Sequence, residues 1–260
     1  MDLGLRGRAA FVGGSSQGMG RAIAELFSGE GADVAMCARR AEELERAAVA
    51  VRTRGRRVVT RVADLADGPA AVAAVEGAVG ELGRLDVLVV NSGGPPPGTF
   101  ADLDDAAWHA AYELTLMSGV RMVRAALPAL RKSDAAAVLF ISSFTIRQPI
   151  ANLVLSNSIR LAVAGLARSL ANELAPKVRV NTVLPGNIRT ERAVELARAR
   201  STAGRKVDDV IAEASRGIPL GRYGEVEDVA RLAVFLCSPA ASYISGAVVP
   251  CDGALIQAPV

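Results

Sequence analysis

Histidine, cysteine and aromatic residues are scarce in this chain. Its 260 residues include one histidine, three cysteines, one tryptophan and three tyrosines. A single histidine argues against a zinc site and against a histidine-based nucleophilic triad. Cys37, Cys237 and Cys251 stand in apolar contexts without metal-ligand spacing. We therefore expect buried, reduced thiols and no metal site.

Long apolar runs and a strong excess of one charge are also absent. Lysine and arginine number 30 against 27 acidic residues, a formal net charge of +3. No basic tract is interleaved with aromatic residues, so nucleic acid is not an expected partner. No apolar run approaches the roughly 18 residues of a membrane-spanning helix, so we expect no membrane partner. Residues 1–14 lack a signal-peptide apolar stretch and lead directly into a glycine turn, which predicts a cytoplasmic protein.

Short runs of valine, leucine and isoleucine alternate with longer helical segments, a pattern typical of βαβ units around a parallel sheet. The predicted strands cover residues 8–12, 32–37, 56–61, 85–90, 136–142, 178–183 and 246–250. They are apolar throughout, which predicts helices on both faces of the sheet. We expect one α/β domain over residues 1–260, with a Rossmann-type, doubly wound, seven-stranded parallel sheet. The charged segment 187–216 breaks this rhythm and is predicted to form a helical flap over the site.

A glycine-rich turn follows the first predicted strand and leads directly into a helical segment. Its residues are Gly13-Gly14-Ser15-Ser16-Gln17-Gly18-Met19-Gly20. Glycines allow the backbone to approach a pyrophosphate, and a helix N-terminus offers free N–H groups and a partial positive charge. This arrangement favours a dinucleotide site that includes Gly14, Ser16, Gly18, Met19 and Gly20, although a plain glycine turn remains an alternative.

The second predicted strand ends in Cys37-Ala38-Arg39-Arg40, where a chain that prefers NAD would carry an acidic residue for the ribose 2′-hydroxyl. Arg39 is instead suited to pair with a 2′-phosphate as a planar, bidentate cation. We therefore expect NADP(H) in preference to NAD(H). The alternative is that Arg39 and Arg40 only solvate the start of a helix.

Further motifs, taken with the glycine turn, resemble those of one family. They are Gly14-xxx-Gly18-x-Gly20, Asp64-Leu65, Asn91-Ser92-Gly93-Gly94, Asn181, Pro185-Gly186-Asn187-Ile188-Arg189-Thr190 and a C-terminal block from IPLGRYG to CDGA. Together they resemble the short-chain dehydrogenase/reductases, especially the branch that includes ketoacyl carrier protein reductases, over nearly the whole chain. The resemblance implies that the cofactor is bound by Asp64 and Leu65 beside the adenine and by Asn91, Gly93, Arg160, Pro185, Gly186, Ile188 and Thr190.

The expected catalytic positions depart from the family pattern. The family uses a serine, a tyrosine, a lysine four residues later and an asparagine on the preceding helix. Ser143 matches the serine, but Ser156 and Arg160 stand where Tyr-xxx-Lys should be, and the asparagine position falls on Thr115. No tyrosine occurs between Phe144 and Leu170. Tyr112 lies one helical turn before Thr115, and we expect it to pack in the interior.

An aliphatic hydroxyl cannot simply replace a phenol, whose pKa of about 10 a nearby cation can lower. We interpret Ser143 and Ser156 as holding a water that transfers the proton. Arg160 is not deprotonated, yet it can hold ribose hydroxyls or stabilise an oxyanion. The leading prediction is an oxidoreductase that transfers hydride to a carbonyl or an activated double bond. The alternatives are a non-redox lyase or isomerase and a cofactor-binding module without turnover.

The expected substrate is a small molecule or a thioester-linked acyl group, since the arginine-rich segment after Pro185-Gly186 suits an acidic ligand. The helical segments at 104–131 and 153–175 are rich in alanine and leucine on more than one face. The family resemblance implies that these helices pair between subunits of a homodimer or homotetramer.

Overall fold

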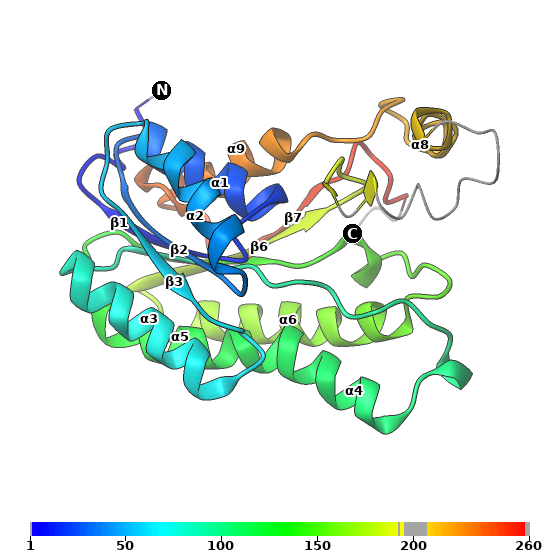
Figure 1. Ribbon diagram of the computed structural model, residues 1–260, viewed down its shortest axis with the longest axis horizontal. Helices are drawn as coiled ribbons and strands as arrows, with labels where there is room; N and C mark the ends of the chain where they lie inside the picture. Colours follow the sequence, from blue (N-terminus) through cyan, green and yellow to red (C-terminus); the bar gives the residue numbers. More distant parts are fainter. Residues whose placement is uncertain (1, 192, 195–206, 258–260) are drawn as a thin grey trace.

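The computed structural model describes residues 2–191, 193–194 and 207–257. Figure 1 shows a central sheet with a layer of helices on each face. The strands are β1 Ala9–Gly13, β2 Asp33–Ala38, β3 Val58–Val62, β4 Val87–Val90, β5 Ala136–Ile141, β6 Val178–Pro185 and β7 Val248–Cys251. The α-helices are α1 Gly18–Gly29, α2 Ala41–Arg52, α3 Gly68–Leu82, α4 Asp105–Tyr112, α5 Ser118–Leu130, α6 Val154–Glu173, α8 Val207–Ser215 and α9 Val226–Cys237.

The seven strands form one parallel sheet in the order β3-β2-β1-β4-β5-β6-β7. This confirms the predicted single-domain, doubly wound Rossmann fold. The strand positions agree with the prediction to within two or three residues. The order reverses between β1 and β4, and at such a point the carboxyl ends of parallel strands leave a crevice that can hold a ligand.

Two hydrophobic cores explain why the strands carry apolar residues at successive positions. On one face Val12, Met36 and Leu139 pack against α1, α2 and α9. On the other face Phe11 and Phe140 pack against α3, α5 and α6. Because neighbouring residues of a strand point to opposite faces, both must be apolar when helices cover both sides.

Helix ends in this fold carry the expected capping chemistry. The Asp67 side chain accepts a hydrogen bond from the Ala70 amide at the start of α3, and Asp104 does the same for Ala107 at the start of α4. Helix α3 ends at Gly83, which adopts the left-handed conformation with φ 78°. These caps satisfy amide and carbonyl groups that have no partner within the helix.

Two details differ from the expectations. The segment 104–131 is not one regular helix, because a π-helical turn at Glu113–Met117 separates α4 from α5. Tyr112 was expected in the interior, and this was wrong: it is 42% exposed at the end of α4. In a regular α-helix, Tyr112 and Thr115 would lie on the same face, because residues i and i+3 are neighbours. The π turn begins directly after Tyr112 and changes this spacing.

Part of the predicted flap at 187–216 can be described. Residues 192 and 195–206 lie outside the described residues, whereas α8 falls within the predicted range. Arg189 Nη2 donates a hydrogen bond to Asp208 Oδ1 of α8 at 2.9 Å. Among the described residues, no helix is long and apolar enough to cross a lipid bilayer.

Asp86 connects the starts of β1, β4 and β5, at the amino ends of the strands and opposite the crevice. Its side chain is 1% exposed and accepts hydrogen bonds from the Ala9 amide, from Arg84 and from Ser133 Oγ. The Asp86 carbonyl oxygen accepts from the Ala137 amide of β5 at 2.9 Å. Burial disfavours the charged carboxylate, but the bonds from Arg84, Ser133 and Ala9 outweigh it and hold the pKa of Asp86 below its ordinary value.

We predict that Asp86→Ala lowers the free energy of unfolding by about 2–4 kcal/mol, because the Ala9 and Ser133 donors lose their buried acceptor. Chemical denaturation at neutral pH measures this loss. The pKa of Asp86 is depressed in the folded state, so its contribution is complete above the unfolded pKa of about 3.9 and is lost as the pH falls through the folded pKa. The difference between wild type and variant should therefore shrink in acid. Glu45→Ala is the control: Glu45 pairs with Arg52 at the surface, away from Asp86, and its loss should leave the denaturation midpoint nearly unchanged.

Candidate active site

A cavity of about 480 Å³ opens at the carboxyl ends of the strands, where the strand order reverses. Most residues predicted from the sequence line this one cavity. They are Gly14, Ser16, Gly18, Met19, Gly20, Arg39, Asp64, Leu65, Asn91, Gly93, Ser143, Ser156, Arg160, Pro185, Gly186 and Thr190. The fold therefore brings the predicted cofactor residues and three of the four predicted catalytic residues together.

Thr115 and Ile188 do not line the cavity. Thr115 lies in the π turn between α4 and α5, where its neighbour Leu114 faces the cavity instead. The Thr115 side chain is buried, and its Oγ1 has no hydrogen-bond partner among the described residues. Ile188 is buried because its backbone forms an isolated bridge with Gly224.

The glycine turn is packed so tightly that side chains have no room. A methyl group on Gly20 would lie 2.3 Å from the Gly14 carbonyl oxygen, and one on Gly14 would lie 2.9 Å from Asn91 Nδ2. Asn91 Nδ2 donates a hydrogen bond to the Gly13 carbonyl oxygen at 2.9 Å. Helix α1 begins at Gly18, and its N-cap residue, Gln17, provides no side-chain cap. The first-turn amides of α1 therefore face the cavity without a side-chain acceptor, which suits an anionic group.

Ser15 connects this turn to β2. Its side chain is fully buried, accepts a hydrogen bond from the Cys37 amide at 2.9 Å and donates one to the Cys37 carbonyl oxygen at 3.3 Å. The residues that follow Cys37 are thereby held beside the glycine turn. Sequence reasoning named the turn but not this contact, because the pairing depends on the parallel register of β1 and β2.

Arg39 and Arg40 stand at the end of β2, with side chains that are 70% and 61% exposed. Arg39 Nη1 lies 3.9 Å from Asp64 Oδ2, and Arg40 Nη2 donates a hydrogen bond to Gln17 Oε1 at 3.3 Å. No acidic residue occupies this strand end, in agreement with the sequence. The cavity therefore carries two exposed cations at one end.

Arg160 and Ser142 connect β5 to α6 at the other end of the cavity. Arg160 Nη1 donates hydrogen bonds to the carbonyl oxygens of Ile141 and Ser142, both at 3.2 Å. Ser142 Oγ donates to the Arg160 carbonyl oxygen, also at 3.2 Å. The guanidinium is thus anchored to the end of the strand that carries Ser143. The sequence analysis did not identify Ser142 as a site residue.

Ser143 and Ser156 bring two hydroxyl groups into this end of the cavity. Ser143 Oγ accepts a hydrogen bond from the Thr145 amide at 3.2 Å, which leaves its own proton available for donation. Ser156 lies in the first turn of α6, and its hydroxyl has no hydrogen-bond partner in the described part of the chain. Two hydroxyls and one guanidinium can bind a carbonyl oxygen, an oxyanion or a water.

Other cavity residues were not predicted from the sequence. They are Gln17, Ala38, Arg40, Ala63, Ser92, Gly94, Pro95, Leu114, Ser142, Leu153 and Glu191. Most of them adjoin predicted residues in the sequence, and this adjacency was the one sign that they would line the cavity. Within the described ranges, no three histidine, cysteine, aspartate or glutamate side chains come close enough to hold a metal ion.

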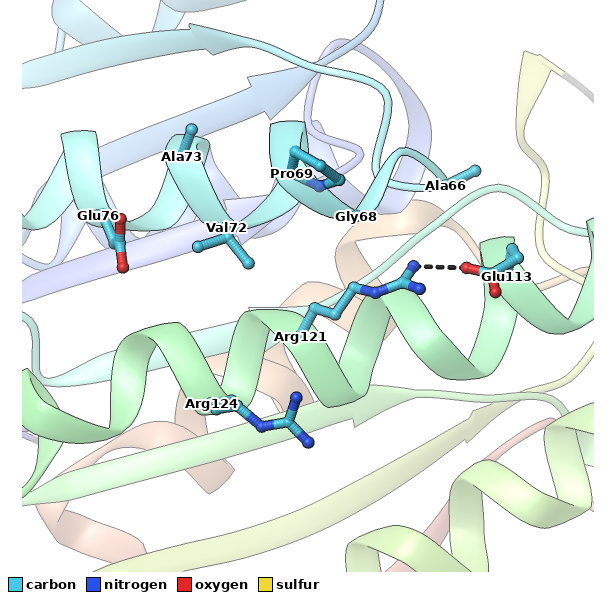
Figure 2. Close-up of a pocket in the computed structure, with 9 residues that line it drawn as sticks. All are labelled: Ala66, Gly68, Pro69, Val72, Ala73, Glu76, Glu113, Arg121 and Arg124. Carbon is cyan, nitrogen blue, oxygen red and sulfur yellow. Dashed lines mark hydrogen bonds and ion pairs between the residues drawn. The ribbon is translucent and has the colours of Figure 1, made fainter.

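A second, shallower depression of about 650 Å³ lies between α3 and α5 (Figure 2). Arg121 crosses its floor toward Glu113, with which it forms an ion pair. The remaining lining comes mostly from α3, including Pro69 and Val72, with Glu76 of α3 and Arg124 of α5 as its charged members. The depression is larger than the cavity at the strand ends, but it includes none of the predicted site residues, so we assign the chemistry to the strand-end cavity.

Both the sequence and the fold match known proteins. The family model described as enoyl-(acyl carrier protein) reductase matches residues 14–255. An uncharacterized oxidoreductase of Mycobacterium tuberculosis is 35% identical over 253 residues, which cover 96% of this chain and 93% of the relative. The structure of L-sorbose reductase from Gluconobacter frateurii, complexed with NADPH and L-sorbose, aligns with a TM-score of 0.96. It is 30% identical and covers 99% of this chain and 100% of its own.

A third similarity is to a 7α-hydroxysteroid dehydrogenase in complex with NADH and 7-oxo glycochenodeoxycholic acid. That structure aligns with a TM-score of 0.89 at 29% identity and covers 99% of this chain and 97% of its own. The family model spans most of the chain and includes the glycine turn, both serines and the Pro-Gly segment, which agrees with the resemblance found from the motifs. The chain belongs to the short-chain dehydrogenase/reductase family of oxidoreductases.

Proposed function

We propose that this protein is an NADP(H)-dependent oxidoreductase that transfers hydride to a carbonyl group or an activated double bond. The observation that carries this proposal is the convergence of two regions in one cavity: the glycine turn with Arg39, and the cluster of Ser143, Ser156 and Arg160. The first region suits a dinucleotide. The second suits an oxygen that gains negative charge when a hydride is added to its substrate.

The residues present fit a dinucleotide. A methyl group on Gly14 or Gly20 would collide with Asn91 or with the Gly14 backbone, so glycine keeps this turn tight against β4. The first-turn amides of α1 then offer donors for a pyrophosphate. Asp64 and Leu65 line the cavity beyond the turn, where they would hold the adenine, and Arg160 lines its other end, where it would hold ribose hydroxyls.

Arg39 supports NADP(H) over NAD(H). Its exposed guanidinium has only a distant ion pair with Asp64, so it can turn toward a 2′-phosphate at little cost. The two aligned structures do not decide the matter, since L-sorbose reductase was solved with NADPH and the hydroxysteroid dehydrogenase with NADH. The preference therefore rests on the charge at the end of β2 in this chain.

When bound, a nicotinamide cofactor supplies the hydride, and the protein must orient the acceptor and provide a proton. Ser143 donates a hydrogen bond to the substrate oxygen. Ser143 and Ser156 hold a water in the space that a phenol ring would fill, and this water passes a proton from bulk solvent to the substrate. Arg160 keeps its charge throughout and stabilises the developing oxyanion, a task for which its attachment to the β5 carbonyls fixes its position. Thr115 lies buried on the π turn outside the cavity lining, so it takes no direct part in these steps.

The substrate is a small molecule or a thioester-linked acyl group. Pro95, Leu114 and Leu153 give the reacting end of the cavity an apolar wall. An activated double bond suits this site because its transition state is enolate-like, so that hydroxyls and an arginine can stabilise it without a strongly acidic phenol. The flap predicted at 187–216 remains part of the proposal, and it is supported by Thr190, which lines the cavity.

A non-redox role is the second candidate. It is favoured by one feature, the serine at position 156 where the family pattern calls for a tyrosine. With the same serines and Arg160, a lyase or isomerase could stabilise an enolate without consuming NADPH, and a cofactor-binding module would show no turnover at all.

We propose further that the protein forms a homodimer or homotetramer through α4, α5 and α6. The outer surface of these helices exposes large side chains, with Tyr112 42% and Leu161 56% exposed. Burial of such side chains against another subunit would remove apolar area from water.

The proposed reaction predicts label transfer. NADPH deuterated at its transferable position is incubated with the pure protein and a panel of ketones, β-ketoacyl thioesters and enones, and products are analysed by mass spectrometry. We expect deuterium in at least one product. Substrate conversion without label would support the lyase or isomerase, and NADPH binding without any conversion would support the binding module.

Cofactor preference is predicted to depend on Arg39. Arg39→Ala should weaken NADPH binding by about 10-fold or more and leave NADH binding nearly unchanged, because only NADPH carries the 2′-phosphate. Titration followed by nucleotide fluorescence measures both dissociation constants. Arg46→Ala is the matched control, since Arg46 is 73% exposed and does not line the cavity. An equal loss for both cofactors would contradict the assigned role.

The proton-transfer role of Ser156 predicts that Ser156→Ala lowers kcat by about 10- to 100-fold, because the water loses one of the groups that hold it. NADPH affinity should change little. Ser158→Ala provides the control from the exposed side of the same helix turn. Steady-state rates with the substrate found in the label experiment measure the effect, and a variant with the wild-type rate would rule out this role for Ser156.

A further inference from the structure

Glu191 places a carboxylate at the glycine turn. A methyl group built on Gly18 would lie 3.5 Å from Glu191 Oε2, and Thr190 Cγ2 would lie 3.6 Å from the same point. Both residues also line the strand-end cavity together with Ser16, Gln17 and Gly18. The chain after β6 thus returns to the point where α1 begins.

The first turn of α1 explains why a carboxylate is stable in this position. The helix begins at Gly18 without a side-chain cap from Gln17, and its first turn contains no acidic residue. Free amides and the helix dipole favour a negative charge at such an end. In the protein without cofactor, the Glu191 carboxylate lies where it gains from this field.

In the described part of the chain, the cations near Glu191 have other partners. Glu191 forms no ion pair with any residue in the described ranges. The adjacent Arg189 is paired with Asp208, and Arg40, across the cavity, is bonded to Gln17. Among the described residues, no cation offsets the negative charge of Glu191 beside the start of α1.

We propose that Glu191 is a negative determinant of dinucleotide affinity: its carboxylate occupies the neighbourhood of the pyrophosphate site and must turn away when the cofactor binds. This inference rests on the proposed function, because it requires a dinucleotide at the glycine turn. A pyrophosphate carries two negative charges, and the charge of the exposed Glu191 carboxylate at the cavity wall opposes its binding, with a repulsion that salt can screen. Glu191 thereby weakens the binding of NADPH and NADH alike, unlike Arg39, which separates them.

The test is the variant Glu191→Gln, which removes the charge and keeps the size of the side chain. Dissociation constants for NADPH and NADH are measured by titration calorimetry at low and at high salt. We expect both cofactors to bind about 10-fold more tightly at low salt, with the ratio between them unchanged. Because salt screens the repulsion, the difference between wild type and variant should narrow at high salt.

Two controls localise the effect. Adenosine 2′-monophosphate lacks the pyrophosphate, so its affinity should be the same for wild type and Glu191→Gln. Glu25→Gln removes an acidic residue from the same helix, outside the cavity lining, and should leave both cofactor affinities unchanged.

The outcomes separate this inference from the proposed function. If wild-type protein binds neither NADPH nor NADH, the proposed function fails. If wild type binds a dinucleotide and Glu191→Gln binds it equally or more weakly, the role of Glu191 is overturned while the proposed function stands. A tighter complex that is equally tight at all salt concentrations, or that extends to adenosine 2′-monophosphate, would also overturn it, because the effect would not be a repulsion of the pyrophosphate.

Discussion

The close packing of the glycine turn against Asn91 is the constraint on which the site depends. A methyl group on Gly13 would lie 2.6 Å from the Asn91 carbonyl oxygen, and Asn91 returns a hydrogen bond to the Gly13 carbonyl oxygen. These residues end β1 and β4, the two neighbouring strands between which the strand order reverses. Their contact holds the two halves of the sheet together at the floor of the cavity, and glycine is required there because any side chain would force the strands apart.

The carboxyl end of β5, the two serines that follow it and helix α6 define the reacting end of the cavity. Arg160 on α6 donates to two carbonyl oxygens at the end of β5, and Ser142 returns a hydrogen bond to the backbone of α6. Ser143, the next residue, carries its hydroxyl into the cavity. Groups held on packed secondary structure lose little entropy when they bind a substrate, so this arrangement suits the orientation of a small acceptor.

Charge varies along the cavity in a way that matches its proposed contents. Arg39 and Arg40 stand exposed at one end, and Arg160 is anchored at the other. Glu191 lies between them, beside the start of α1. Arg39, Arg40 and Glu191 are all exposed, so each acts mainly through its placement, whereas the half-buried Arg160 is held by backbone carbonyls. Affinity and cofactor choice can therefore be set by different residues.

Most residues predicted to hold the cofactor line one cavity, and their role there stays a prediction. The sequence by itself determined the fold class, the strand positions to within a few residues and the family. These inferences succeeded because they rest on local signals: apolar runs, a glycine turn between a strand and a helix, and motif spacing. The exposure of Tyr112 was misjudged because a π turn changed the helical spacing beside it. The tertiary structure alone decided that Ser15 anchors β2, that Ser142 and Arg160 hold β5 to α6, and that Glu191 reaches α1. Each of these contacts joins segments that are distant in sequence. The distances between such segments depend on strand register and on the packing of the crossover helices, and no local sequence pattern encodes either.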